Sequence, residues 1–126
     1  MKRITLAVIE SYYLIREAIA QSMTTLGFDV IIKTGDYADF VHQSKPLVPD
    51  ICLIEAVAPT LGYSEIISNI RKQYPAIKII GYTLGEQEYI AREHPGIDLF
   101  ISKGTDTDVI KKRITALAYE LKPDSS

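Results

Sequence analysis

The chain has 126 residues, which suits one domain with a proper core and is too short for two ordinary domains. Hydrophobic residues make up 47% and charged residues 24%, a balance that excludes an intrinsically disordered chain. The net charge of −2 gives no overall field that would draw the protein to nucleic acid or to an anionic membrane, so we expect neither as a partner of this domain.

The cysteine content and the start of the chain indicate a cytoplasmic protein. The single cysteine, Cys52, cannot form an internal disulfide, which fits a reducing compartment and a packed thiol. Residues 1–9 are basic and then apolar, but charged Glu10 follows without the small-residue signature of a cleavage site. No apolar run is long enough to span a bilayer.

The first third of the chain changes from a strand pattern to a helix pattern and back. Residues 4–9 are apolar and β-prone, and residues 12–26 then carry apolar side chains at helical spacing. Gly27 follows, where the end of a helix favours a left-handed conformation. Residues 28–33 predict a second strand, and Asp36 is a suitable N-cap for a short helix after it.

The middle of the chain holds the most informative run. Residues 50–55 are mostly apolar and β-prone, which predicts a strand buried on both faces of a sheet. This run ends at Glu55, and Pro59 follows four residues later in a loop. A helix over residues 66–74 is expected next, with one apolar face, and Pro75 ends it.

The last third predicts two more strands and two helices. Residues 77–82 give a fourth strand, residues 85–94 a short polar helix, and residues 97–101 a fifth strand. A final helix is expected to begin near Thr105, with two aspartates in its first turn, where they suit the positive end of the helix dipole.

Five strands that alternate with helices imply a parallel sheet with helices on both faces, that is, an α/β doubly wound domain. We expect this domain to span residues 1–122, with residues 123–126 as a frayed tail or the start of a linker.

Polar residues follow four of the predicted strands. The motif positions are Glu10-Ser11, Glu55, Thr83 and Lys103. Because the carboxyl ends of parallel strands meet at one edge of the sheet, these residues are expected to be neighbours in space. Two acids, a hydroxyl and an ammonium group gathered there would suit a phosphoryl group or an ion.

This combination resembles the receiver domain of two-component response regulators, over residues 4 to about 121. In that family a pair of acids follows the first strand, and the pair is matched here by Glu10 and Ser11. The family's phosphoacceptor aspartate ends the third strand a few residues before a proline, and here Glu55 takes that place. The resemblance implies a flavodoxin-like five-stranded parallel sheet of strand order 2-1-3-4-5.

The second half of the resemblance concerns the residues that respond to phosphorylation in the family. A Ser or Thr after the fourth strand is matched by Thr83, and an aromatic residue of the fifth strand by Phe100. The family's phosphate-contacting lysine is matched by Lys103. The helical patterning looks most like the receivers attached to helix-turn-helix DNA-binding domains, which implies transcription regulation.

The departures from the family pattern concern its chemistry. Ser11 replaces a metal-binding acid, while Glu10 and Glu55 are each longer than aspartate by one C–C bond, about 1.5 Å. Mg²⁺ demands a nearly ideal octahedron, and phosphoryl transfer depends on in-line positioning. The Mg²⁺ site of Glu10, Ser11 and Glu55 is therefore expected to be degenerate, with weak or absent Mg²⁺ binding, no other cofactor and no catalytic residue.

Three functions remain open at this point. The favoured one is a pseudo-receiver that signals through protein contacts without phosphorylation. The second is a working receiver of a two-component transcriptional regulator that takes phosphate on Glu55. The third is a small α/β nucleotide- or flavin-binding protein, which lacks support because no glycine-rich phosphate-binding motif follows a strand.

A receiver-like module implies a protein partner, namely an effector domain, a kinase or another regulator. The resemblance also allows a homodimer through the last two helices and the fifth strand. The adjacent Tyr12 and Tyr13 either cap the pocket or belong to the surface, and residues 111–113 form a basic patch on the last helix. With 126 residues there is no room for an effector domain, so we expect a stand-alone regulator or a module of a longer one.

Overall fold

The computed structural model describes residues 3–55, 63–82, 96–102 and 104–120. The helices and strands along the chain are β1 (Thr5–Ile9), α1 (Tyr13–Thr25), β2 (Asp29–Thr34), α2 (Tyr37–Ser44), β3 (Ile51–Glu55), α3 (Tyr63–Gln73), β4 (Lys78–Tyr82), β5 (Leu99–Ile101) and α5 (Thr107–Ala118). The strands form one parallel sheet in the order β2-β1-β3-β4-β5. The predicted doubly wound sheet and its strand order are confirmed.

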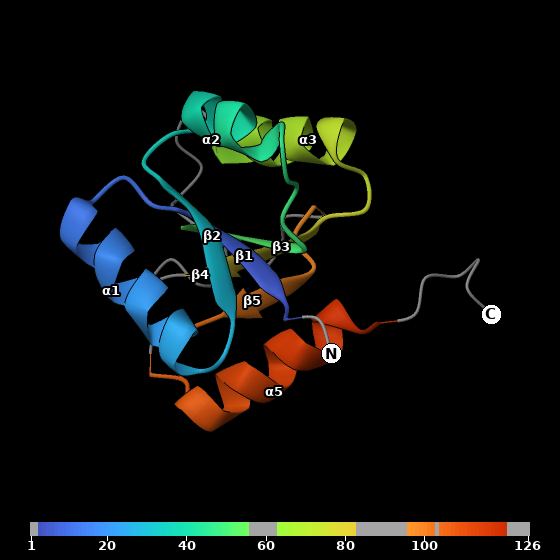
Figure 1. Ribbon diagram of the computed structural model, residues 1–126. Coiled ribbons are helices and arrows are strands. Elements are labelled where there is room, and N and C mark those ends of the chain that lie inside the picture. Colours follow the sequence, from blue (N-terminus) through green and yellow to red (C-terminus); the bar gives the residue numbers. More distant parts are fainter. Residues whose placement is uncertain (1–2, 56–62, 83–95, 103, 121–126) are drawn as a thin grey trace.

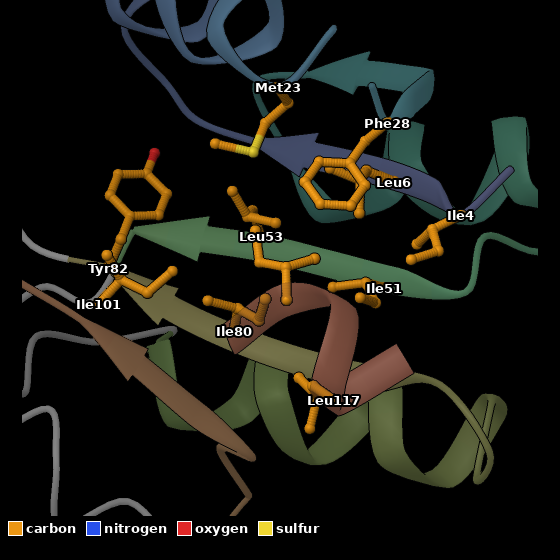
Figure 2. Packing of buried hydrophobic residues seen from close by; sticks show 11 residues of the cluster. Ile4, Leu6, Met23, Phe28, Ile51, Leu53, Ile80, Tyr82, Ile101 and Leu117 are labelled. Atoms are coloured by element: carbon orange, nitrogen blue, oxygen red, sulfur yellow. The ribbon is translucent and has the colours of Figure 1, made fainter. Parts of the chain in front are cut away.

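The helices cover the two faces of the sheet in pairs. Figure 1 shows α1 and α5 on one face and α2 and α3 on the other. Along β3, Ile51 and Leu53 pack into the core on the α1/α5 side, which Figure 2 shows, whereas Cys52 and Ile54 pack into the core on the α2/α3 side. The prediction that this strand is buried on both faces is therefore confirmed.

Cys52 lies in the middle of this central strand and is fully buried. Burial among apolar side chains raises the pKa of its thiol to about 12, because the charged thiolate is poorly solvated there. The thiol therefore stays protonated at physiological pH, which agrees with the predicted packed cysteine and excludes a nucleophilic role for it.

The end of α1 shifts the second strand by one residue from its predicted range. Gly27 adopts a φ of +101°, and the backbone N–H of Phe28 donates to the carbonyl of Met23 over 3.1 Å. This is the hydrogen bond of a left-handed helix cap, so Phe28 still belongs to the helix end. The strand predicted over residues 28–33 accordingly runs from Asp29 to Thr34.

Arg71 on α3 binds the segments before β4 and β5 at the edge of the sheet. The fifth strand also begins later here than the sequence predicts. Its guanidinium donates to the carbonyls of Ile77 (2.7 Å) and Gly96 (2.9 Å) and forms an ion pair with Asp98. The carboxylate of Asp98 also accepts from the backbone N–H of Ile79 over 2.7 Å. The backbone N–H of Asp98 donates to the carbonyl of Ile79 over 2.9 Å, but the Ile79 N–H bonds to a side chain, and β5 begins at Leu99 and not at residue 97.

Helix starts are confirmed in one case and corrected in another. The Asp36 side chain accepts from the backbone N–H of Asp39 over 2.8 Å and caps α2 as predicted. The last helix starts at Thr107, later than predicted, because the N–H and hydroxyl of Thr105 both bond to the carbonyl of Ser102 in a turn. The helix expected over residues 85–94 lies outside the described residues, whereas the last helix ends at Ala118 within them. Each helix that the structure describes is too short or too polar to cross a bilayer.

Candidate site at the carboxyl edge of the sheet

Glu10 follows β1 and is buried at the carboxyl edge of the sheet, with only 1% of its surface exposed. Its backbone N–H donates to the carbonyl of Thr34 over 2.9 Å, which continues the pairing with β2. One carboxylate oxygen accepts from the backbone N–H of Tyr12 over 2.9 Å, and the other accepts from the hydroxyl of Tyr82. Both oxygens of this carboxylate therefore have donors from within the protein.

Tyr82 is the last residue of β4 and lies opposite Glu55 in the pairing of β3 with β4. Its ring is buried in the core on the α1/α5 side, and Figure 2 shows it at the carboxyl ends of the strands. Burial and the hydrogen bond to Glu10 raise the pKa of the Tyr82 hydroxyl well above its usual value. The hydroxyl consequently remains a proton donor to Glu10 over the physiological range.

Glu55 is the last residue of β3, the strand between those that lead to Glu10 and Tyr82, and its side chain is half-buried. Partial burial raises the pKa of its carboxyl group, and the negative charge of Glu10 raises it further. Strand alternation places Glu55 on the same face as Leu53 and beside Tyr82. The structure thus brings Glu10 and Glu55 together at the edge where the sequence predicted them.

The segment after β1 is held by Arg16, which the sequence analysis did not single out. The Arg16 guanidinium donates to the carbonyl of Glu10 over 2.7 Å and lies 5.5 Å from the centre of the Tyr13 ring. Gly35 leaves room for it, because a Cβ atom at that position would lie 3.0 Å from Arg16 Nη1. Tyr12 and Tyr13 are 66% and 63% exposed, so both side chains belong to the surface.

The remaining predicted site residues are distributed as follows. Ser11 is exposed, next to the buried Glu10. Phe100 is half-buried and packs against the core on the α2/α3 side of the sheet. Thr83 and Lys103 lie outside the described residues.

Tyr82 is a residue of this candidate site that the sequence analysis does not single out. In the sequence it is the last member of an apolar run, directly before Thr83. A signal was nevertheless present, because a tyrosine buried at the end of a central strand needs a partner for its hydroxyl. The acid at the end of β1 was the nearest predicted acceptor on the same edge.

The geometry at this edge fits a bound Mg²⁺ ion poorly. Mg²⁺ takes carboxylate oxygens in a strict octahedron, yet both oxygens of Glu10 already accept hydrogen bonds. Ser11 adds no charge in place of a second acid. Within the described ranges there is no group of three or more His, Cys, Asp or Glu residues arranged to hold a metal ion.

Comparison with known proteins gives a structural match without a sequence match. No protein-family profile matches the chain, and no curated protein is similar to it in sequence. The receiver domain of RcsB from Salmonella enterica serovar Typhimurium, solved with the phosphate mimic BeF3−, superposes with a TM-score of 0.76 at 16% identity, over 96% of this chain and 92% of that one.

Two further solved structures give the same result. The receiver domain of the putative response regulator NarL from Mycobacterium tuberculosis has a TM-score of 0.76 at 18% identity, over 96% of this chain and 100% of that one. A LuxR-family two-component response regulator from Aurantimonas sp. SI85-9A1 has a TM-score of 0.77 at 18% identity, over 98% and 92% of the two chains. The chain therefore has the fold of the receiver domains of response regulators.

Proposed function

We propose that this chain is a receiver-like signalling module that acts in the cytoplasm through protein contacts, without phosphorylation and without Mg²⁺. One observation carries the proposal. The buried carboxylate of Glu10 is already bonded on both oxygens, to the Tyr12 N–H and to the Tyr82 hydroxyl. A metal ion could reach the remaining lone pairs of these oxygens only by entering the buried site beside the two donors, because just 1% of the Glu10 surface is exposed.

Opening this buried site would disturb the two hydrogen bonds, which is costly because a buried charge relies on them. Leaving a buried hydrogen-bonding group unsatisfied costs about 1–3 kcal/mol, and more when the group is charged. The ion would have to recover this cost with Ser11, a neutral ligand, in place of a second carboxylate. These two terms both oppose Mg²⁺ binding.

The position of Glu55 supports the same proposal. Its carboxylate extends further from the backbone than that of an aspartate by about 1.5 Å, the length of a C–C bond. A misplacement of about 1 Å can slow a reaction on the order of a hundredfold when the reaction depends on positioned groups. Partial burial and then the charge of Glu10 raise the pKa of Glu55, which supports the view that the site disfavours the further negative charge of a phosphoryl group.

The test is a backbone amide NMR titration with Mg²⁺ and then beryllofluoride. We expect no saturable, Mg²⁺-dependent shifts in the wild-type protein. The double variant Ser11→Asp with Glu55→Asp restores two aspartates and is expected to bind Mg²⁺ clearly more tightly. Its matched control is Ser68→Asp with Glu65→Asp, the same two changes on exposed positions of α3.

Saturable shifts of the Thr83 and Lys103 amides in the wild-type protein would contradict the proposal and favour a phosphate-accepting receiver. An unchanged Mg²⁺ affinity in the double variant would show that the edge does not assemble as described. A rise in affinity in the control as well would trace the effect to added surface charge.

The output would pass through a protein partner, which we propose is an effector domain, a kinase or another regulator. The exposed basic residues Lys111, Lys112 and Arg113 on α5 are candidates for this contact, and α5 with β5 is also the face proposed for a homodimer. Light scattering over a range of concentrations tests the homodimer. Charge reversal at Lys112 should lower the mass of any dimer, whereas reversal at Lys72 on α3 should not.

A further inference from the structure

An apolar cavity of about 470 Å³ lies between α1 and α5, and neither the fold nor the proposed signalling role accounts for it. Its floor consists of Leu53, Tyr82 and Ile101 from three neighbouring strands. Ala18 and Ile110 contribute to its walls from α1 and α5. None of the described residues that line the cavity carries a charge.

The cavity exists because the facing sides of the two helices carry small residues. Ala18 and Ser22 on α1, and Gly104 just before α5, all line the cavity without filling it. Protein interiors are normally close-packed and leave few voids larger than a water molecule. Apolar cavities stay dry and take up apolar guests, and small-molecule sites measure about 300–1,000 Å³.

We propose that this cavity binds an uncharged, largely apolar small molecule of roughly the size of a ten-carbon alcohol. The described lining residues are uncharged and would leave a charged ligand without a partner among them, which disfavours such a ligand. The exposed hydroxyls of Ser22 and Thr107 line the cavity and can bond a single polar group of the ligand.

A second copy of the chain is the competing occupant, because Leu14 is 79% exposed at the edge of the cavity. The shape favours a small molecule. The floor residues Leu53, Tyr82 and Ile101 are only 3%, 6% and 7% exposed, and residues of α1 and α5 line the cavity beside them, so it is a half-open recess between two helices and not a flat face. A flat association surface would leave such residues more accessible.

Tyr82 connects this cavity to the carboxyl edge of the sheet. Its ring lies in the floor, while its hydroxyl donates to Glu10 beside Glu55. A ligand that packs against the ring would therefore change the hydrogen bond to Glu10 and the surroundings of Glu55. Ligand binding would take the place that phosphorylation has in a signalling module of this fold.

The experiment is a methyl NMR titration of the Ile- and Leu-labelled protein with n-decanol, compared with decanoate and decyltrimethylammonium. We expect saturable shifts of the Leu53, Ile101 and Ile110 methyl groups with n-decanol. Binding of both charged analogues should be weaker on the order of tenfold or more, because the described residues that line the cavity offer no counter-charge.

Two cavity-filling variants provide the controls. Ala18→Phe places a ring in the cavity and should abolish decanol binding, whereas Ala38→Phe, on exposed α2 at the other face of the sheet, should bind like the wild type. Ser22→Leu is a smaller filling change that serves if Ala18→Phe does not fold. Tyr82→Phe should keep decanol binding but lose the accompanying shift of the Glu10 and Glu55 side chains.

The proposal is overturned if decanol shifts are absent, non-saturable or equal in Ala18→Phe and Ala38→Phe. Equal affinity for the charged analogues would also overturn it. A concentration-dependent dimer that Ala18→Phe disrupts, in a protein that does not bind decanol, would assign the cavity to a second copy of the chain.

Discussion

Tyr82 at the end of β4 donates a hydrogen bond to the carboxylate of Glu10 after β1, although β3 lies between these two strands. The bond reaches over the carboxyl end of β3, next to the position of Glu55. It supplies a donor to a carboxylate that is almost fully buried, so an ion could bind this oxygen only by entering the buried site beside the Tyr82 hydroxyl.

Removing the Tyr82 hydroxyl should destabilise the fold. In Tyr82→Phe the ring stays in place while Glu10 loses one of its two donors, so the free energy of unfolding should fall by about 1–3 kcal/mol. Chemical denaturation followed by circular dichroism measures this. Tyr12→Phe removes a hydroxyl from an exposed ring and keeps the backbone N–H that bonds Glu10, so it should change stability little. Equal losses in the two variants would show that the Tyr82–Glu10 bond contributes nothing.

Neutralising Glu10 should lower the pKa of Glu55. Burial accounts for the larger part of the raised value and the charge of Glu10 for the rest, so Glu10→Gln should move the pKa only part of the way to normal. Carboxyl-carbon NMR titration of Glu55 gives the value directly. Glu17→Gln, which removes an acid paired with Lys33 on the surface, is the control and should leave Glu55 unaffected. A Glu55 pKa that does not respond to Glu10→Gln would mean that the two carboxylates do not interact.

The raised pKa of Glu55 also predicts a pH dependence of stability. The folded state holds the Glu55 proton more tightly than the unfolded state, so the free energy of unfolding should fall as pH rises from the ordinary value of 4.5 through the raised value. Relative to Glu55→Gln, the wild type should lose on the order of 0.5 kcal/mol, a small amount because the side chain is partly solvated. Denaturation of both proteins between acidic and neutral pH measures the difference. The loss should shrink in a Glu10→Gln background, and a wild type that gains stability relative to Glu55→Gln as pH rises would contradict the assignment.

The hydrogen bonds and the ion pair of the Arg71 guanidinium should stabilise the edge of the sheet. Lysine cannot donate at once to the carbonyls of Ile77 and Gly96 and to Asp98, so Arg71→Lys should cost about 1–3 kcal/mol in the free energy of unfolding. Arg113→Lys on the exposed face of α5 is the matched control, with a small expected effect. Hydrogen exchange should locate the loss at the Ile79 amide, which Asp98 accepts from. Unchanged protection there would show that Arg71 does not hold Asp98 in place.

The sheet could be predicted because its signals are local and repeated. Apolar β-prone runs alternate with helical stripes, and that alternation alone implies a parallel doubly wound sheet. The observed starts of β2 and β5 differ from the predicted ones, because hydrogen bonds that the apolar pattern does not reveal determine where these strands begin. The N–H of Phe28 bonds to the end of α1, and the N–H of Ile79 bonds to the Asp98 side chain, where strand pairing was expected.

The candidate site could be predicted only as far as strand ends indicate it. The sequence placed Glu10 and Glu55 at one edge, because the carboxyl ends of parallel strands meet there. It did not show that Glu10 is bonded on both oxygens, since Tyr82 is distant in sequence and belongs to an apolar run. The cavity between α1 and α5 depends on how two helices fill one face, which no residue pattern within either helix specifies.

The central claim, that the module works without phosphorylation, is tested most directly by intact-mass spectrometry after incubation with acetyl phosphate and Mg²⁺. The account predicts that the wild-type mass does not change. A phosphoryl adduct is expected, if at all, in the double variant Ser11→Asp with Glu55→Asp. A phosphoryl adduct on the wild-type protein that is labile to hydroxylamine and absent from Glu55→Gln would contradict the account.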